Sequence, residues 1–389
     1  MIKYLGSKRR LVPVLSRICL ASGARTALDL FTGTTRVAQA FKAHGVHVTA
    51  VDSARYAHTF ARTYIEADAA ATDAGALRAA VAHLNGLPGR PGYVTETFSH
   101  QARFFQPHNA ARIDAVRDAI DSDYAGSPLF PLLLTSLIEA ADRVDSTTGV
   151  QMAYVKQWAP RSSNPLELRV PELLVGSGRA IQGDAVALVD GHWPGQDGRG
   201  HGLGLGHFDL AYLDPPYNQH RYFTNYHVWE TLVAWDAPEA YGVARKRLDA
   251  RDPSTHSVFN SKRAMPAALA SVVQSVDCDL LVLSYNNESW LALEELEAMC
   301  SVPRRAVATL SFDSARYVGA RIGIFDPSGR KVGRVSHLSN QELLVIAGEP
   351  ALVRRVVGAV GGHDTSDGAR SATSAAVAAG LADRLQQAT

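Results

Sequence analysis

The sequence predicts an α/β fold: a mostly parallel sheet covered by helices on both faces, with an inserted, mainly helical subdomain. Short apolar runs end in Asp, Gly or Pro turns and alternate with segments of helical spacing. Polar residues cluster where these runs end, which is the ligand-binding edge of a parallel sheet. A long alanine-rich stretch with helical patterns and few strand signals interrupts the alternation and predicts the insertion.

Four apolar runs are predicted strands: residues 27–31, 46–51, 208–213 and 280–283. The first is followed by a glycine turn, 32–35, and by a segment of helical spacing, 37–42. The second ends at Asp52, the third at Asp214, and the fourth at a polar Ser-Tyr-Asn sequence. This order predicts repeated strand–helix units with polar groups gathered at one edge.

The sheet domain is predicted to comprise residues 1–66 and 179–350, resuming at Gly183-Asp184 after the helical insertion 67–178. Within the insertion, helices are expected over 109–120 and 129–144. Residues 191–206 are glycine-dense and predict a surface loop. Residues 351–389 are interpreted as a linker and tail, with helical composition in 374–387.

Composition excludes several classes of protein. With 46% hydrophobic and 20% charged residues, the chain has the composition of a soluble globular protein, and no apolar run approaches the roughly 20 residues of a membrane span. Its three cysteines are scattered, so we expect no disulfide framework, no metal site and a reducing cytoplasm. The net charge is only +1, so any DNA-binding surface must come from local basic clusters, at 8–10, 245–247, 262–263 and 304–305.

Two acidic residues lie near the ends of the first two predicted strands. Asp29 precedes the turn that contains Gly33, and Asp52 follows the second strand. A glycine turn allows close approach of a ligand, and a carboxylate after the second strand is placed to bind ribose hydroxyls. The three-glycine spacing of a dinucleotide site and the GK[ST] of a phosphate loop are absent. The pair favours a nucleoside-containing cofactor, with a plain turn and a helix cap as the alternatives.

The most specific signal is the sequence Asp214-Pro215-Pro216-Tyr217 directly after a predicted buried strand. Two prolines make a rigid turn without backbone donors, so nearby carbonyls remain free as acceptors. A carboxylate, a carbonyl and an adjacent aromatic ring suit an aromatic exocyclic amine, whose two protons they can hold while the ring stacks. The alternative is an ordinary strand-end turn with an Asp cap and a core tyrosine.

With these motifs together, the sequence resembles the D12 class of adenine-specific DNA methyltransferases, which includes the Dam-type enzymes. The matches occur in the family's order: residues 3–8 (KYLGSK), 29–34 (DLFTGT), Asp52, Gly183-Asp184 and 214–217 (DPPY). The resemblance spans residues 1–348 and is weak across the insertion. It implies a Rossmann-like class I methyltransferase fold, S-adenosylmethionine as cofactor with S-adenosylhomocysteine as product, and methyl transfer to N6 of a flipped adenine.

The resemblance also implies a role for individual residues. Cofactor contacts are implied for Tyr4, Gly6, Lys8, Asp29, Phe31, Thr32, Gly33, Asp52 and Asp184. Asp52 would hold the ribose and Asp184 the adenine of the cofactor. Asp214 and the carbonyl of Pro215 would bind the target amine, Pro216 would complete the turn, and Tyr217 would stack on the base.

Double-stranded DNA is the expected partner, bound by a monomer, with a cognate restriction endonuclease as a possible second partner. The residues expected to contact DNA are Lys3, Arg9, Arg143, Arg221, Tyr222, Tyr226, Arg247 and Lys262. For the two tyrosines, which share a helix face, core packing is the alternative, and for each basic residue a solvated surface or an ion pair. The insertion occupies the place of the family's target-recognition domain, but does not resemble recognition helices specific for GATC.

Two classes of alternative function stay open. One is a related amino-methyltransferase acting on cytosine N4, RNA or a protein glutamine, although Asp at position 214 favours adenine. The other is a non-catalytic DNA-binding protein that retains the fold. The presence of Lys8, Gly33, Asp52, Asp214 and Tyr217 argues against loss of catalysis.

Overall fold

The computed structural model describes residues 2–155, 157–191, 205–217, 219, 221–287, 289–301, 305–315 and 339–361. Its centre is a seven-stranded sheet of order β3-β2-β1-β4-β7-β9-β8. The strands are β1 (Thr26–Asp29), β2 (His47–Asp52), β3 (Arg179–Gln182), β4 (Phe208–Leu213), β7 (Cys278–Asn286), β8 (Ala306–Ala315) and β9 (Ser339–Gly348). From β3 to β7 all neighbours are parallel, and β9 is antiparallel to both β7 and β8.

The predicted α/β fold with a mostly parallel sheet is confirmed. Each predicted strand matches an observed one, namely β1, β2, β4 and β7, whereas β3, β8 and β9 were not predicted as strands. The strand order reverses beside β1: β2 and β3 lie on one side of it, and β4 and β7 on the other. Such a reversal leaves a crevice at the carboxyl ends of the strands, where ligands bind in folds of this type.

Alternating side chains of the buried strands supply one core on each face of the sheet. In β4, Leu210 and Tyr212 pack with α1 (Val12–Ser22), α2 (Arg36–Ala43) and α3 (Arg55–Ala61). Ala211 and Leu213 face the opposite side with α7 (Ala185–Val189), α10 (Met265–Ser275) and α11 (Leu293–Cys300). The two-sided covering explains why these strands read as continuous apolar runs.

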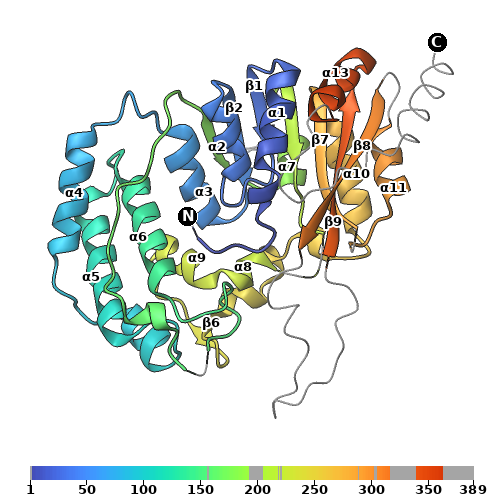
Figure 1. The fold of residues 1–389 in the computed structure, drawn as a ribbon. Helices are drawn as coiled ribbons and strands as arrows, with labels where there is room; N and C mark the ends of the chain where they lie inside the picture. Colours follow the sequence, from blue (N-terminus) through green and yellow to red (C-terminus); the bar gives the residue numbers. More distant parts are fainter. Residues whose placement is uncertain are drawn as a thin grey trace.

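The predicted helical insertion is present between β2 and β3. It contains α4 (Ala74–Gly86), α5 (Pro107–Tyr124) and α6 (Phe130–Val144), which Figure 1 shows grouped at one side of the sheet beside α3. Phe104, Ile113 and Leu133 of the insertion belong to the same buried cluster as Phe60 of α3. The insertion therefore shares a continuous core with one face of the sheet domain.

The remaining elements are short and connect these layers. They are α8 (Tyr222–Asn225), α9 (His227–Ala234), the hairpin β5 (Ala240–Tyr241) and β6 (Lys246–Arg247), the π-helical segments η2 (Arg62–Glu66) and η3 (Thr95–His100), and the 3-10 turns η1 (Lys8–Arg10), η4 (Pro160–Ser163), η5 (Leu248–Arg251), η6 (Pro253–Thr255) and η7 (Val258–Asn260). Among the described helices, none combines the length and apolar character that a membrane crossing needs.

The predicted domain boundary at residue 350 is wrong. Helix α13 (Pro350–Gly361) follows β9, packs beside α1 and buries Val353, Val356 and Val360. Its apolar residues at i, i+3 and i+7 make it part of the sheet domain instead of a linker. Most of the predicted glycine-dense loop (192–204) and the predicted tail helix (374–387) lie outside the described residues.

Candidate active site

A cavity of about 410 Å³ opens at the carboxyl ends of the parallel strands. It is lined by the amino-terminal segment, by the ends of β1 to β4, by α8 and α9, and by a segment around η6 and η7. Of the sequence-predicted site residues, it is lined by Tyr4, Gly6, Phe31, Asp52, Asp184, Asp214, Pro215, Pro216, Tyr217, Arg221 and Tyr222. Residues of the first motif, 3–8, and of the last, 214–217, thus line one cavity at the sheet edge that the strand pattern predicted.

The turn after β1 requires glycine at position 33. Gly33 has a φ of +51°, and a Cβ atom added there would lie 3.0 Å from Oη and 3.2 Å from Cε1 of Tyr4. The N–H of Gly33 donates to Oδ2 of Asp52 at 2.8 Å. The turn is therefore fixed from two sides, by the ring of Tyr4 and by the carboxylate at the end of β2.

Asp52 organises two backbone segments and retains unused acceptor capacity. Its Oδ2 accepts from Gly33, and its Oδ1 accepts from the N–H of Ala54 at 2.9 Å. Burial raises its pKa, and these amide donors oppose that rise. Each carboxylate oxygen has two lone pairs, so Asp52 can accept further hydrogen bonds from a ligand that enters the cavity.

Asp29 and Thr32 support the turn from behind and do not line the cavity. Both are buried, and the hydroxyl of Thr32 donates to Oδ2 of Asp29 at 3.0 Å. Burial raises the pKa of Asp29 to about 7, and the nearby Asp214 adds to the rise. Since neither residue borders the cavity, their predicted cofactor contacts stay a prediction, and the structure gives them a supporting position.

An ion-pair cluster, largely buried, lies at the turn that follows β4. Nζ of Lys8 lies 3.2 Å from Oδ1 of Asp214 and 2.9 Å from Oε2 of Glu342, and 5.6 Å from the ring centre of Tyr217. Burial raises the pKa of Asp214 to about 6, while Lys8 lowers it and Glu342 raises it. For Lys8, burial alone would lower the pKa, but Asp214, Tyr217 and Glu342 outweigh it, so that the pKa is raised and the ammonium is retained.

Sequence reasoning missed two acidic residues of the site, Glu342 and Glu230. Glu342 begins the apolar part of β9, and its Oε1 accepts from Nδ2 of Asn286 on the neighbouring β7 at 3.2 Å. Glu230 lies on α9 and lines the cavity, although only 1% of its surface is exposed. An acid within an otherwise apolar strand or helix face was the available signal in both cases.

Three stacked tyrosines form the wall between the amino-terminal segment and α9. The ring centre of Tyr4 lies 5.4 Å from that of Tyr222 and 5.0 Å from that of Tyr226. The hydroxyl of Tyr226 accepts the N–H of Leu5 at 2.7 Å, and its side chain is 1% exposed. Tyr226 is therefore out of reach of DNA, and the alternative of core packing applies to it, whereas Tyr222 lines the cavity.

Arg247 is also buried, which corrects its predicted DNA contact. Its guanidinium donates to Asp236 at 2.7 and 2.6 Å and to Asp249 at 3.1 and 2.7 Å. The side chain is 2% exposed. All five N–H donors of an arginine lie in one plane, and here two carboxylates occupy that fork, so no donor faces solvent for a phosphate.

The other predicted DNA contacts divide into two groups. Nζ of Lys3 is paired with Asp142 at 2.9 Å and Asp145 at 3.2 Å, and Arg143 donates to the carbonyl of Glu167 at 2.7 Å. Arg9, Arg221 and Lys262 are exposed, and Arg221 lines the cavity, with its Nη1 2.8 Å from Nε2 of His256. The exposed group retains the accessibility that a phosphate contact needs.

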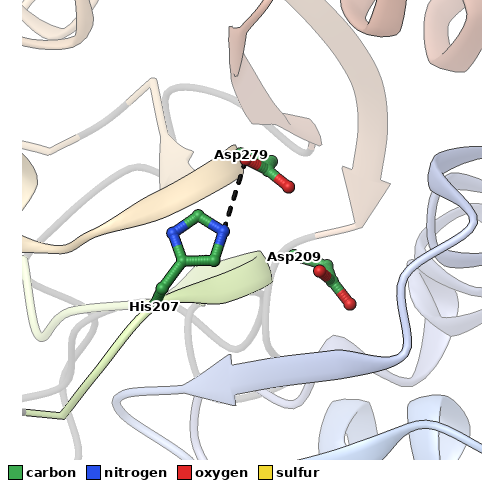
Figure 2. A group of neighbouring side chains, drawn as sticks. All are labelled: His207, Asp209 and Asp279. Carbon is green, nitrogen blue, oxygen red and sulfur yellow. Dashed lines mark ion pairs between the residues drawn. The ribbon is translucent and has the colours of Figure 1, made fainter.

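A separate acidic cluster lies at the opposite end of the strands. His207, Asp209 and Asp279 lie near one another at the starts of β4 and β7, with Nε2 of His207 3.4 Å from Oδ1 of Asp279 (Figure 2). Asp209 already accepts the N–H groups of Arg25 and Thr26 at 2.7 and 2.9 Å, and His207 also pairs with Asp277. Protein groups thus account for these contacts, far from the cavity along the strands.

Comparison with known proteins identifies the family that the motifs resemble. The family model of D12 class N6 adenine-specific DNA methyltransferases matches residues 4–189 and 204–299. Modification methylase StsI of Streptococcus sanguinis is 28% identical over 76% of this chain and 45% of its own length. Type II methyltransferase M.NlaIII of Neisseria lactamica is 28% identical over 76% of this chain and 86% of its own length. Type II methyltransferase M.FokI of Planomicrobium okeanokoites is 25% identical over 77% of this chain and 46% of its own length. The chain therefore spans about half the length of StsI and M.FokI, and most of M.NlaIII.

Proposed function

Because this chain belongs to the D12 class of N6 adenine-specific DNA methyltransferases, we propose that it methylates N6 of adenine at specific sites in double-stranded DNA, with S-adenosylmethionine as the methyl donor. One observation carries the proposal. Asp214 lines the cavity at the end of β4, as Asp52 does at the end of β2, and Lys8 forms an ion pair with it. This arrangement sets an acceptor for an amine beside a pocket for a nucleoside.

The residues of the cavity fit the proposed donor. Its walls carry four carboxylates, from Asp52, Asp184, Asp214 and Glu230, which suit a ligand with a sulfonium and an ammonium group. The turn at Gly33 packs closely against Tyr4, which lines the cavity. We assign Asp52 to the ribose and Asp184 to the adenine of the cofactor, with Tyr4, Gly6 and Phe31 completing its pocket.

The reaction requires an aromatic amine to act as a nucleophile. S-adenosylmethionine supplies an electrophilic methyl group when bound. Lys8 engages Oδ1 of Asp214, which leaves Oδ2 to accept one N–H of the target amine. The carbonyl of Pro215 accepts the other, and these two bonds restore nucleophilic character to the nitrogen lone pair. As the nitrogen gains the methyl group, its surplus proton passes to Oδ2 of Asp214.

A base inside a duplex cannot reach this cavity, so the adenine must be extruded. Tyr217 supplies a ring for stacking, and its pKa is raised by burial, which keeps it neutral. Arg9, Arg221 and Lys262 supply phosphate contacts that offset the cost of unstacking. Residues 67–178 serve as the target-recognition domain, and the chain acts as the modification enzyme of a restriction–modification pair.

The proposal is tested by incubating the full chain with methyl-labelled S-adenosylmethionine and mixed genomic DNA, followed by nucleoside analysis. We expect labelled N6-methyladenine with the wild type and none with Asp214→Ala. Label on N4 of cytosine would overturn the assignment of the target base. No label in DNA, from a protein that binds S-adenosylhomocysteine, would overturn the DNA methyltransferase activity itself.

A further inference from the structure

Glu230 is a buried carboxylate at the wall of the cavity, and none of the sequence motifs includes it. Its Oε1 accepts the N–H of Tyr56 at a long distance of 3.5 Å, and the backbone of Arg55 also donates to this carboxylate. Within the described part of the chain, no lysine, arginine or histidine nitrogen forms an ion pair with it. Glu230 therefore borders both the cavity and the first turn of α3, and its carboxylate retains lone pairs for a ligand.

A purely structural role explains Glu230 poorly. A carboxylate at a helix start stabilises that helix modestly, whereas removal of a carboxylate from water is costly unless its oxygens are well paired. Burial raises the pKa of Glu230 to about 7, even though Arg55 and the amides of α3 oppose the rise. The contacts within the protein thus compensate the desolvation of this carboxylate only in part, as is typical of groups at binding sites.

The position of Glu230 indicates which part of a ligand it faces. Oδ1 of Asp52 accepts the N–H of Ala54, and Oε1 of Glu230 accepts the N–H of Tyr56, two residues further along the same turn. The two carboxylates reach this turn from different elements, β2 and α9, and both line the cavity. Two acceptors that line one cavity and contact one turn two residues apart match a ligand group with two neighbouring donors.

We propose that Glu230 and Asp52 together bind the two adjacent ribose hydroxyls of the cofactor, so that α9 contributes to cofactor binding as well as the sheet. This inference rests on the proposed function, since it takes the cofactor to be S-adenosylmethionine. Tyr226, one helical turn before Glu230 on α9, stacks on Tyr4, so a ribose held by Glu230 is linked to the wall that carries the amino-terminal motif.

The experiment is calorimetric binding of S-adenosylhomocysteine and of its 2′-deoxy and 3′-deoxy analogues to the full chain. We expect the wild type to prefer the intact ribose over at least one analogue by about tenfold or more, because a missing hydroxyl leaves a buried acceptor unpaired. Glu230→Gln keeps an oxygen for the N–H of Tyr56 but removes the charge, and Glu230→Ala removes both. Each variant should reduce the preference for the intact ribose to about threefold or less. Glu66 is an exposed acid beyond α3, so Glu66→Gln should leave this preference unchanged.

Thermal melting of the same proteins separates the possible results. If Glu230→Ala melts at a lower temperature but both variants keep the wild-type preference for the intact ribose, Glu230 is only a cap for α3 and the inference is overturned. If the wild type binds DNA but not S-adenosylhomocysteine, the proposed cofactor is wrong, and the inference falls with it. If the wild type binds S-adenosylhomocysteine and only the Glu230 variants lose the preference for the intact ribose, the inference is supported.

Discussion

Nζ of Lys8 lies 3.2 Å from Oδ1 of Asp214, which joins the amino-terminal motif to the turn that follows β4. The same ammonium lies 2.9 Å from Glu342, which reaches it from β9. Lys8 lowers the pKa of Asp214, Glu342 raises it, and burial, the largest effect, raises it to a net value of about 6. The charge state of Asp214, the proposed acceptor for the target amine, therefore depends on three segments that are far apart in the sequence.

The first prediction concerns the pH dependence of methyl transfer. Asp214 must be ionised to accept a hydrogen bond and then a proton from the amine, so the rate should fall about tenfold per pH unit below about pH 6. Lys8→Met removes the group that lowers the pKa of Asp214 and should shift this acidic limb to higher pH. Glu342→Gln removes a group that raises it and should shift the limb to lower pH. Single-turnover rates measured across pH 5 to 8 would check both shifts.

The opposite directions of these shifts make the test specific. A general loss of packing would lower the rate in both variants without moving their pH profiles apart. Shifts of the same sign in Lys8→Met and Glu342→Gln would show that the cluster does not set the ionisation of Asp214.

The second prediction concerns stability. The folded pKa of Asp214, about 6, lies above the unfolded value near 4. Folding is therefore unaffected by this group below about pH 4, is progressively disfavoured as the pH rises to about 6, and carries a constant cost of up to about 3 kcal/mol above that. Asp214→Asn should abolish methyl transfer and raise the melting temperature at pH 8, with a smaller gain at pH 4. Scanning calorimetry at both pH values measures the difference, and equal or lower stability at pH 8 would contradict the prediction.

The third prediction compares two glycines with left-handed backbones. Gly33 has a φ of +51° and faces Tyr4, whereas Gly45 has a φ of +78° and nothing within 4 Å of an added Cβ. Alanine at either position should destabilise the fold by about 1 kcal/mol through backbone strain. Only Gly33→Ala should also displace Tyr4 and weaken binding of S-adenosylhomocysteine, by about tenfold. Calorimetric titration of both variants checks this, and equal affinities would show that the contact with Tyr4 does not shape the pocket.

The sequence pattern located four strands of the sheet, β1, β2, β4 and β7, and the motif residues at their ends, because these depend on local signals. Strand β4 and its Asp-Pro-Pro-Tyr turn were predicted at their observed positions, since a buried apolar run and two prolines specify their own geometry. Lys8 was placed in the site by the family's motif, but its contact with Asp214 depends on how the amino-terminal segment crosses the sheet edge. Sequence spacing carries no information on that crossing.

The contacts that sequence reasoning missed are those between distant elements. Glu342 reaches Lys8 only because β9 is inserted antiparallel between β7 and β8, an order that strand patterns alone do not specify. Arg247 looked like part of a basic surface cluster, yet Asp236 and Asp249 enclose it once α9 and the short hairpin fold together. Local charge indicates a basic patch, but only tertiary structure decides whether its partner is a phosphate or a neighbouring acid.

The fourth prediction distinguishes a basic residue that pairs with neighbouring acids from one that contacts a DNA phosphate. Arg247→Gln should lower stability by about 2 kcal/mol, less than for a fully buried pair because Asp236 and Asp249 are 41% and 42% exposed. Arg9→Ala and Lys262→Ala change exposed side chains and should each weaken DNA binding and reduce the slope of log affinity against log salt by about 1. Fluorescence anisotropy with a duplex at several salt concentrations, together with denaturant unfolding, measures both quantities. If Arg247→Gln had wild-type stability but a reduced slope of log affinity against log salt, Arg247 would be a DNA contact and the prediction would be wrong.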